Sequence, residues 1–346
     1  MASTHECKGK IQTVNGLLEP DRLGPTLIHE HVLCDFTPPA QTESDEKEVE
    51  ISLENVWEIR YHWNKHLGNS RLDQEDIAIK ELKLIGELKG LSLVELSNIG
   101  TRRNPLGLQR IAKEANVNII MGCGYYIEEF LSPQMREESI EEMAKLMITD
   151  IVRGVDGSDV RSGIIGEIGC SYPWTEMEKR VMRAALISQQ ETGSTISIHP
   201  GRHFGAPYDI LQFIREAGGD PTRTIMGHLD RTVFDKDTLS RLADQGCTLE
   251  YDFFGIDSSY YPFQEVDLPN DGTRLSLIRF LINRGHLAQI LISHDICTKT
   301  RLVSYGGHGY GHIFRNIVPM MKRKGFTETE IDALLIINPR RLLTFN

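Results

Sequence analysis

Apolar residues along this chain fall into eight short runs, and longer amphipathic segments separate them. The runs are nearly continuous in apolar residues, which is the pattern of parallel strands buried on both faces of a sheet. We therefore expect strands over 25–32, 91–98, 118–126, 163–169, 194–200, 223–229, 246–254 and 289–295.

The segments between these runs carry apolar residues at helical spacing. The clearest of them are 75–89, 138–155, 177–192, 209–217, 235–245 and 273–284. Eight strand–helix units in succession predict an α/β protein, a closed (β/α)8 TIM barrel that forms one domain over residues 1–346. An open doubly wound sheet is the structural alternative, but no glycine-rich phosphate loop follows the first strand.

Three excursions interrupt the alternation. Residues 11–19, with Asn15 and Gly16 at their centre, predict an N-terminal two-residue hairpin that caps the barrel floor. Residues 36–74 and 255–271 form long loops, which in a barrel would lie around the mouth. The first loop contains an acidic run, 43–48, which we expect to be solvated surface.

Composition and charge narrow the classes of function. The chain has 346 residues, 40% hydrophobic and 25% charged, as in soluble globular proteins. Its formal net charge of −11 argues against nucleic acid or an anionic membrane as a partner. Residues 1–10 are too polar for a signal peptide, and no apolar stretch is long enough to span a bilayer. The six scattered cysteines fit no disulfide framework, so we expect a cytoplasmic protein with reduced thiols.

Histidines and carboxylates recur where the apolar runs end. The first run ends in His29-Glu30-His31, and side chains two apart on a strand point the same way. A buried imidazole or carboxylate must be paired or bound to a metal ion. We therefore expect a metal centre at the barrel mouth, with candidate ligands His29, His31, Glu167, His199, His228 and Asp295.

Six ligands are too many for one tetrahedral zinc ion. They suit two divalent ions about 3.5–4 Å apart that share a carboxylate and a hydroxide. The natural division gives His29, His31 and Asp295 to one ion. It gives His199 and His228 to the other, with Glu167 as the bridge. The mixed nitrogen and oxygen ligands are compatible with Zn²⁺, our first choice, and also with Mn, Co or Fe.

The sequence around these residues resembles the phosphotriesterase-like branch of the amidohydrolase superfamily, and above all its animal members. The matching motifs are 24–31, 163–169, 198–199, 227–228, 293–295, 306–311 and 338–339, and the match covers nearly the whole chain. The resemblance implies a binuclear metal hydrolase on a distorted (β/α)8 barrel. It also implies a possible homodimer, because barrels of this family are often dimers.

One position departs from the best-known bacterial phosphotriesterases, which bridge their metals with a carboxylated lysine. In an ungapped comparison that lysine falls at Gly166, and this chain supplies Glu167 instead. A shift of one residue reverses side-chain direction on a strand, so a bulge or altered register is needed for Glu167 to act as the bridge. Efficient organophosphate hydrolysis is correspondingly not implied.

The chemistry expected of such a site follows from the ions. Two cations would lower the pKa of a bridging water, and the resulting hydroxide would attack a polarised carbonyl or phosphoryl group. The catalytic residues would be Asp295, which would accept the proton and pass it to the leaving group, and the bridge Glu167. The resemblance implies amide hydrolysis of N-acyl taurines, such as N-acetyltaurine, to taurine and a carboxylate.

An anionic small-molecule substrate needs local positive charge in this acidic protein. The candidates for binding the anion are Arg202, His203 and Arg231. The candidates for contacting the acyl group are Tyr125, Tyr126 and Phe254. Two alternative functions stay open. A lactonase or phosphotriesterase would use the same metals with a more apolar pocket, and a metal-bound scaffold protein would have no activity.

Overall fold

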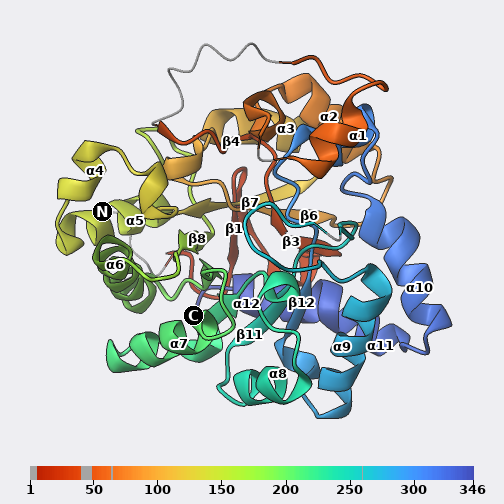
Figure 1. Cartoon of the computed structure of the whole chain (residues 1–346). Helices are drawn as coiled ribbons and strands as arrows, with labels where there is room; N and C mark the ends of the chain where they lie inside the picture. Colours follow the sequence, from red (N-terminus) through yellow and green to blue (C-terminus); the bar gives the residue numbers. More distant parts are fainter. Residues whose placement is uncertain (1–5, 40–48, 64, 259) are drawn as a thin grey trace.

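Eight parallel strands form one sheet at the centre of the molecule (Figure 1). The structure is a computed structural model that describes residues 6–39, 49–63, 65–258 and 260–346. The strands follow one another in chain order around the sheet. They are β3 (Thr26–Glu30), β6 (Ser92–Glu95), β7 (Asn118–Cys123), β8 (Ile164–Gly169), β9 (Ile196–His199), β10 (Thr224–Met226), β11 (Thr248–Tyr251) and β12 (Ile290–Ile292).

The two end strands of this sheet, β3 and β12, lie beside each other and nearly close it into a barrel. The backbone N–H of Asp295 donates to the carbonyl of His29 at 3.1 Å. The hydroxyl of Ser293 accepts from the N–H of His29 at 3.0 Å and donates to Glu30 at 2.8 Å. The predicted (β/α)8 TIM barrel is therefore confirmed.

Helices surround the barrel (Figure 1). They are α1 (Val56–Tyr61), α2 (Glu75–Lys83), α3 (Pro105–Ala115), α4 (Pro133–Glu137), α5 (Ile140–Val152), α6 (Glu176–Thr192), α7 (Ala206–Glu216), α8 (Lys236–Ala243), α9 (Asp271–Asn283), α10 (Val318–Arg323), α11 (Glu328–Asp332) and α12 (Asn338–Leu343). The longest, α6, begins at a capping box of Thr175 and Glu178 and ends at Gly193 in the left-handed conformation. Its apolar face, which includes Val181 and Ala185, is buried in the main core.

Each of the eight apolar runs contains one barrel strand, although every strand is shorter than its run. The six clearest helical segments are also present. Helix α2 ends at Lys83 rather than 89, and Gly86 and Gly90 take positive φ angles beyond it. Such angles suit glycine and stop a helix. The pattern therefore located the elements but not their ends. It made the strands and α2 too long, whereas α7 and α9 begin before the predicted segments, at Ala206 and Asp271.

The predicted N-terminal hairpin consists of β1 (Ile11–Thr13) and β2 (Gly16–Leu18), which pair antiparallel. Its turn residues are Val14 and Asn15, one position earlier than expected, because Gly16 already pairs with Thr13. The N–H of Val14 donates to the carbonyl of Ile119 at 2.9 Å, which attaches the hairpin to β7 near the floor of the barrel.

Both long loops reach the barrel mouth. The first contains α1 and β5 (Arg71–Leu72), which pairs antiparallel with β4 (Cys34–Asp35) just before the loop. The acidic run 43–48 lies outside the described residues. All six cysteines are free thiols. Among the described helices, none has both the length and the apolar character needed to cross a bilayer.

Candidate metal centre

The six predicted ligand residues come together at the carboxyl ends of the barrel strands, with Glu167 among them. One set of donors lies on the β3 and β12 side. His29 Nε2 is 3.6 Å from Glu167 Oε2, and His31 Nε2 is 3.6 Å from Glu167 Oε1. Asp295 Oδ1 lies 3.3 Å from His31 Nε2 and 3.8 Å from His29 Nε2.

A second set of donors lies on the other side of the same carboxylate. His199 Nδ1 and His228 Nε2 are 3.0 Å and 3.3 Å from Glu167 Oε2. These two ring nitrogens are 2.8 Å apart. Glu167 therefore contacts both sets, in the arrangement that the sequence predicted for a bridging residue.

The donor atoms fit a pair of divalent ions. His29, His31 and Glu167 can place three ligand atoms within 4.8 Å of one another, and so can Glu167, His199 and His228. The Nε2 atoms of His29 and His31 are buried and have no hydrogen-bond partner among the described residues. Because a buried polar atom without a partner is unfavourable, these atoms favour a ligand that accepts their lone pairs.

A bulge in β8 brings Glu167 to the centre. Ile165 pairs with Ile196 and Ile168 with Ile198, so β8 holds one more residue than β9 over this stretch. Gly166 occupies the bulge with φ +135°, and a Cβ on it would lie 2.5 Å from the carbonyl oxygen of Ser197. The bulge that Glu167 requires is therefore present, and only glycine fits before it.

Two of the candidate ligands have strained backbones. His228 and Asp295 take φ angles of 53° and 50°, which non-glycine residues adopt rarely. The N–H of His228 donates to Asp252 Oδ2 at 2.8 Å, and the N–H of Asp295 donates to the carbonyl of His29. Such strain persists where the surrounding contacts determine the conformation, and it is concentrated at functional sites.

Two carboxylates behind the histidines were missed by the sequence analysis. Asp252 Oδ2 lies 3.2 Å from His29 Nδ1, and its Oδ1 lies 2.9 Å from His228 Nδ1, so it contacts one histidine of each set. Glu250 lies 3.1 Å from His29 Nδ1. The sequence does contain a signal for them. Glu250 and Asp252 lie two residues apart at the end of the seventh strand, as His29 and His31 do at the end of the first.

Further hydrogen bonds fix the first strand end. His31 Nδ1 lies 2.9 Å from the hydroxyl of Ser97, which donates to Glu95 at 2.6 Å. Tyr310 donates its hydroxyl to the carbonyl of His31 at 2.6 Å. His294, next to Asp295, points away from the two sets and lies 2.6 Å from Glu30.

Burial and neighbouring charges set the protonation of the site. Burial alone would raise the pKa of Glu167, but His199, His228 and His29 lower it well below its usual value. Burial is the main cause that lowers the pKa of His199 well below that of a free imidazole. An ionised carboxylate and a neutral imidazole are the forms that bind metal ions.

A cavity of about 280 Å³ opens above Glu167, His199, His228 and Asp295. Of its other lining residues, seven are aromatic, two are arginines and one, Glu129, is a carboxylate. They include Phe36, Trp63, Tyr126, Phe130, Phe253, Tyr261, Phe263, Arg202 and Arg231. Of the predicted substrate-binding residues, Arg202, Arg231 and Tyr126 therefore reach the cavity.

The other three predicted substrate-binding residues are placed away from it. Tyr125 donates its hydroxyl to Glu138 at 2.5 Å. His203 stacks on Tyr172 with ring centroids 4.0 Å apart. Phe254 is fully buried in the main core, and its neighbour Phe253 lines the cavity instead. Neighbouring residues of an extended chain point in opposite directions, so an error of one position exchanges a wall residue for a core residue.

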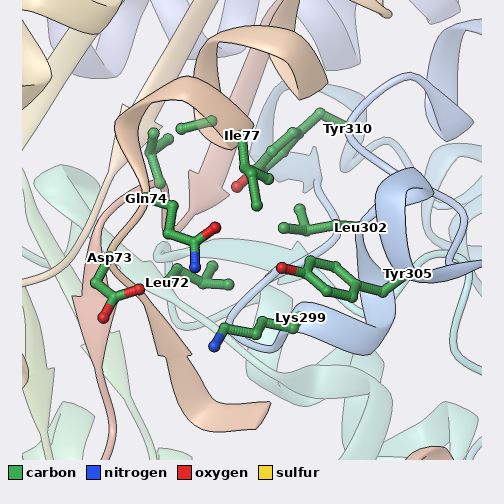
Figure 2. A pocket seen from close by; sticks show the side chains of 10 residues that line it. Leu72, Asp73, Gln74, Ile77, Lys299, Leu302, Tyr305 and Tyr310 are labelled. Atoms are coloured by element: carbon green, nitrogen blue, oxygen red, sulfur yellow. The ribbon is translucent and has the colours of Figure 1, made fainter. Parts of the chain in front are cut away.

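A second cavity lies beside α2 and the segment 299–310 (Figure 2). Gln74 and Tyr305 point toward one another across it. Its volume of about 10 Å³ suits about one water molecule and no substrate. The cavity above the two donor sets is the candidate active site because Glu167, His199, His228 and Asp295 line it.

Known proteins resemble this chain over nearly its whole length. The model of the phosphotriesterase family matches residues 9–343. The N-acetyltaurine hydrolases of Dictyostelium discoideum and Homo sapiens are each 42% identical to this chain, over 97% of it and 98% of their own lengths. A crystal structure of a resiniferatoxin-binding protein from Rhodobacter sphaeroides matches with a TM-score of 0.90 and 32% identity, and covers 97% of this chain and 96% of that one.

Proposed function

Since the chain belongs to the phosphotriesterase family, we propose that it is a binuclear metal-dependent amidohydrolase whose substrate is N-acetyltaurine. It cleaves the carbon–nitrogen amide bond and releases taurine and acetate. The convergence of four histidines and two carboxylates at the floor of one cavity carries this proposal. The substrate is taken from relatives at 42% identity over nearly their whole lengths.

The proposed ligands are the two donor sets described above, with Zn²⁺ as the proposed metal. Two divalent ions, when bound, supply a water molecule of lowered pKa and polarise the amide carbonyl. His29, His31 and Asp295 would hold one ion, His199 and His228 would hold the other, and Glu167 lies within reach of both sets. Zn²⁺ accepts this mixture of imidazole and carboxylate ligands readily.

Asp295 is the proposed proton carrier. Its side chain lines the cavity and is 8% exposed, so it faces both the donor sets and the space for substrate. It accepts a proton from the attacking water and delivers it to the amide nitrogen, which then leaves as an amine. The carbonyl of His29 fixes its backbone and thereby orients the carboxylate.

The cavity suits a small acyl group. Its volume of about 280 Å³ lies just below the usual range for ligand pockets, and Phe36, Tyr126 and Phe130 form an aromatic wall. Aromatic rings exclude water and pack against a methyl group without a polar partner. We propose a cytoplasmic enzyme that acts on a small anionic molecule, with a homodimer as the assembly to test by light scattering.

Side-by-side turnover tests the function. The purified chain, loaded with Zn²⁺, is incubated with N-acetyltaurine, a lactone and an aryl phosphotriester, and the products are quantified by mass spectrometry. We expect kcat/KM for N-acetyltaurine to exceed the other two by about 100-fold or more, as a site that binds a specific polar group requires. A preference for the lactone or the phosphotriester would instead support those activities. Two bound ions without turnover of any substrate would support a scaffold protein.

A further inference from the structure

The guanidinium of Arg231 is buried in the cavity wall, and no described carboxylate forms an ion pair with it. Arg231 ends a short 3-10 turn after β10, and its side chain is 0% exposed. Its Nη2 donates to the carbonyl of Pro200 at 3.0 Å and lies 3.1 Å from His199 Nε2. Its Nε and Nη1 are buried and have no hydrogen-bond partner among the described residues.

A second buried arginine shows what the chain does elsewhere. Arg274 is also 0% exposed, but its Nε donates to Asp230 at 2.5 Å and its Nη1 donates to Asp271 at 2.9 Å. Among the described carboxylates, none forms an ion pair with Arg231. A buried cation without an anion is strongly unfavourable, so Arg231 is suited to receive negative charge from a bound molecule.

We propose that Arg231 anchors the anionic end of the substrate and thereby selects the substrate class. That class is N-acyl amines that carry a sulfonate, or an acid of the same charge, two carbons from the amide nitrogen. The inference rests on the proposed amidohydrolase function. Guanidinium N–H groups form strong, charge-assisted hydrogen bonds to such oxyanions.

The position of Arg231 fits this spacing. One edge of the His199 ring contacts Arg231 through Nε2, and the other edge joins the donor set through Nδ1. The guanidinium is thus one imidazole ring away from the donor atoms, which is of the order of the two-carbon spacer of an aminoethanesulfonate. The acyl group then extends toward Phe36 and Phe130, on the aromatic wall.

Arg202, the other arginine in the cavity, is held differently. Its Nε donates to the hydroxyl of Tyr261 at 3.0 Å, and its guanidinium lies 4.7 Å from the ring centroid of Phe263. Arg202 also forms no ion pair with a described carboxylate, but it is only partly buried, so solvent can stabilise its charge. The guanidinium of Arg231 is fully buried, and its need for a bound anion is therefore greater.

Paired substrates test the anchor. N-acetyltaurine is compared with N-(2-methylsulfonylethyl)acetamide, which replaces the sulfonate by a neutral sulfone of similar size. In Arg231→Gln, the preference for the sulfonate in kcat/KM should fall by about 30-fold, the size expected for loss of a charged hydrogen bond, and mainly through KM. Arg231→Lys, which keeps the charge, should lose less of the preference. Arg241→Gln on the exposed face of α8 is the matched control and should keep it.

Binding without turnover separates this inference from the proposed function. Propane-1-sulfonate and propyl methyl sulfone are titrated into the Zn²⁺-loaded protein by calorimetry, and their effect on Tm is recorded. Wild type should bind the sulfonate and gain Tm only with it, and Arg231→Gln should bind it about 10-fold or more weakly. If wild type binds the sulfonate but does not hydrolyse N-acetyltaurine, the proposed function is wrong, and the anion-binding role of Arg231 still stands.

Three results would overturn the anchor. One is an equal loss of both substrates in Arg231→Gln. Another is unchanged binding of the sulfonate in that variant. The third is equal stabilisation of wild type by the sulfonate and the sulfone, which does not depend on how well any variant folds.

Discussion

Asp252 contacts one histidine of each donor set, through Oδ2 to His29 and Oδ1 to His228. Burial alone would raise its pKa, but His228 and His29 lower it well below its usual value. An ionised carboxylate in this position would orient both imidazoles so that their opposite nitrogens face the proposed ions. At the scale of single residues, Asp252 therefore couples the two halves of the metal centre.

Asp252→Asn should weaken the binding of both ions, because an amide orients an imidazole less strongly than a carboxylate does. Partners of this kind contribute about 10–100-fold to metal affinity. Competition with a chromogenic chelator measures both dissociation constants, and Asp237→Asn on the exposed face of α8 is the control. Unchanged affinities for both ions would refute the coupling role.

Asp295→Asn should remove nearly all turnover while at least one ion stays bound. An asparagine cannot accept the proton of the attacking water, and proton transfer by a positioned group contributes about 10²–10⁴-fold to the rate. Steady-state kinetics and elemental analysis of the same preparation measure the two quantities. Near-normal turnover of this variant would remove Asp295 from the proposed role.

At the residue scale, the sequence indicated residues that lie together where a type of side chain stood out against an apolar strand. The histidines at 29, 31, 199 and 228 were visible in that way, and the structure brings them together. Asp252 was not predicted, although it stands with Glu250 at the end of the seventh apolar run, because a carboxylate that supports a ligand histidine has no motif of its own. Tyr125 and Phe254 are core residues, and their neighbours Tyr126 and Phe253 line the cavity instead. A sequence does not specify which side chains turn inward at the end of a strand.

The bulge of β8 is the element that makes Glu167 central. Without the additional residue, the side chain that follows Gly166 would point to the opposite face of the strand. The comparison with bacterial phosphotriesterases indicated this bulge, because their bridging lysine falls at Gly166 and Glu167 stands one residue later. Shorter features, such as α1 and the β4–β5 pair, were not predicted, because two to six residues carry too little periodicity.

Gly166→Ala tests this element. An added Cβ would lie 2.5 Å from the carbonyl oxygen of Ser197, in addition to the strain of a positive φ angle. Gly246→Ala is the matched control, because Gly246 has φ +90° with no atom within 4 Å of the added Cβ. The control should lose about 1–2 kcal/mol of unfolding free energy, the cost of the angle alone.

Chemical denaturation of the two variants measures the difference. We expect Gly166→Ala to lose more unfolding free energy than Gly246→Ala and to bind less than two ions per chain. Equal losses in the two variants, with full metal content, would show that the bulge does not require a glycine.

At the scale of the whole molecule, the barrel collects groups from five different strand ends into one cavity. Such a set of buried histidines and carboxylates is stabilised when ions bind, and ions that bind only the folded state stabilise it by about 2.7 kcal/mol at 100 times their dissociation constant. The barrel itself was predictable, because eight apolar runs alternate with helical segments. The contents of the cavity were only partly predictable, because they depend on loops such as 255–271 that carry no periodic pattern.

Removal of metal by a chelator should therefore lower Tm by several degrees, and added Zn²⁺ should restore it. Mg²⁺, which prefers oxygen ligands, should restore little and serves as the control. Differential scanning calorimetry makes the comparison. An unchanged Tm after complete removal of metal would mean that no ion contributes to the folded state.

The most direct test of the account is anomalous diffraction from crystals of the Zn²⁺-loaded protein, recorded on both sides of the zinc absorption edge. We predict two anomalous peaks per chain, both in contact with Glu167. One should lie beside His29, His31 and Asp295, and the other beside His199 and His228. A single peak, or peaks away from these residues, would contradict the binuclear site on which the proposed hydrolysis depends.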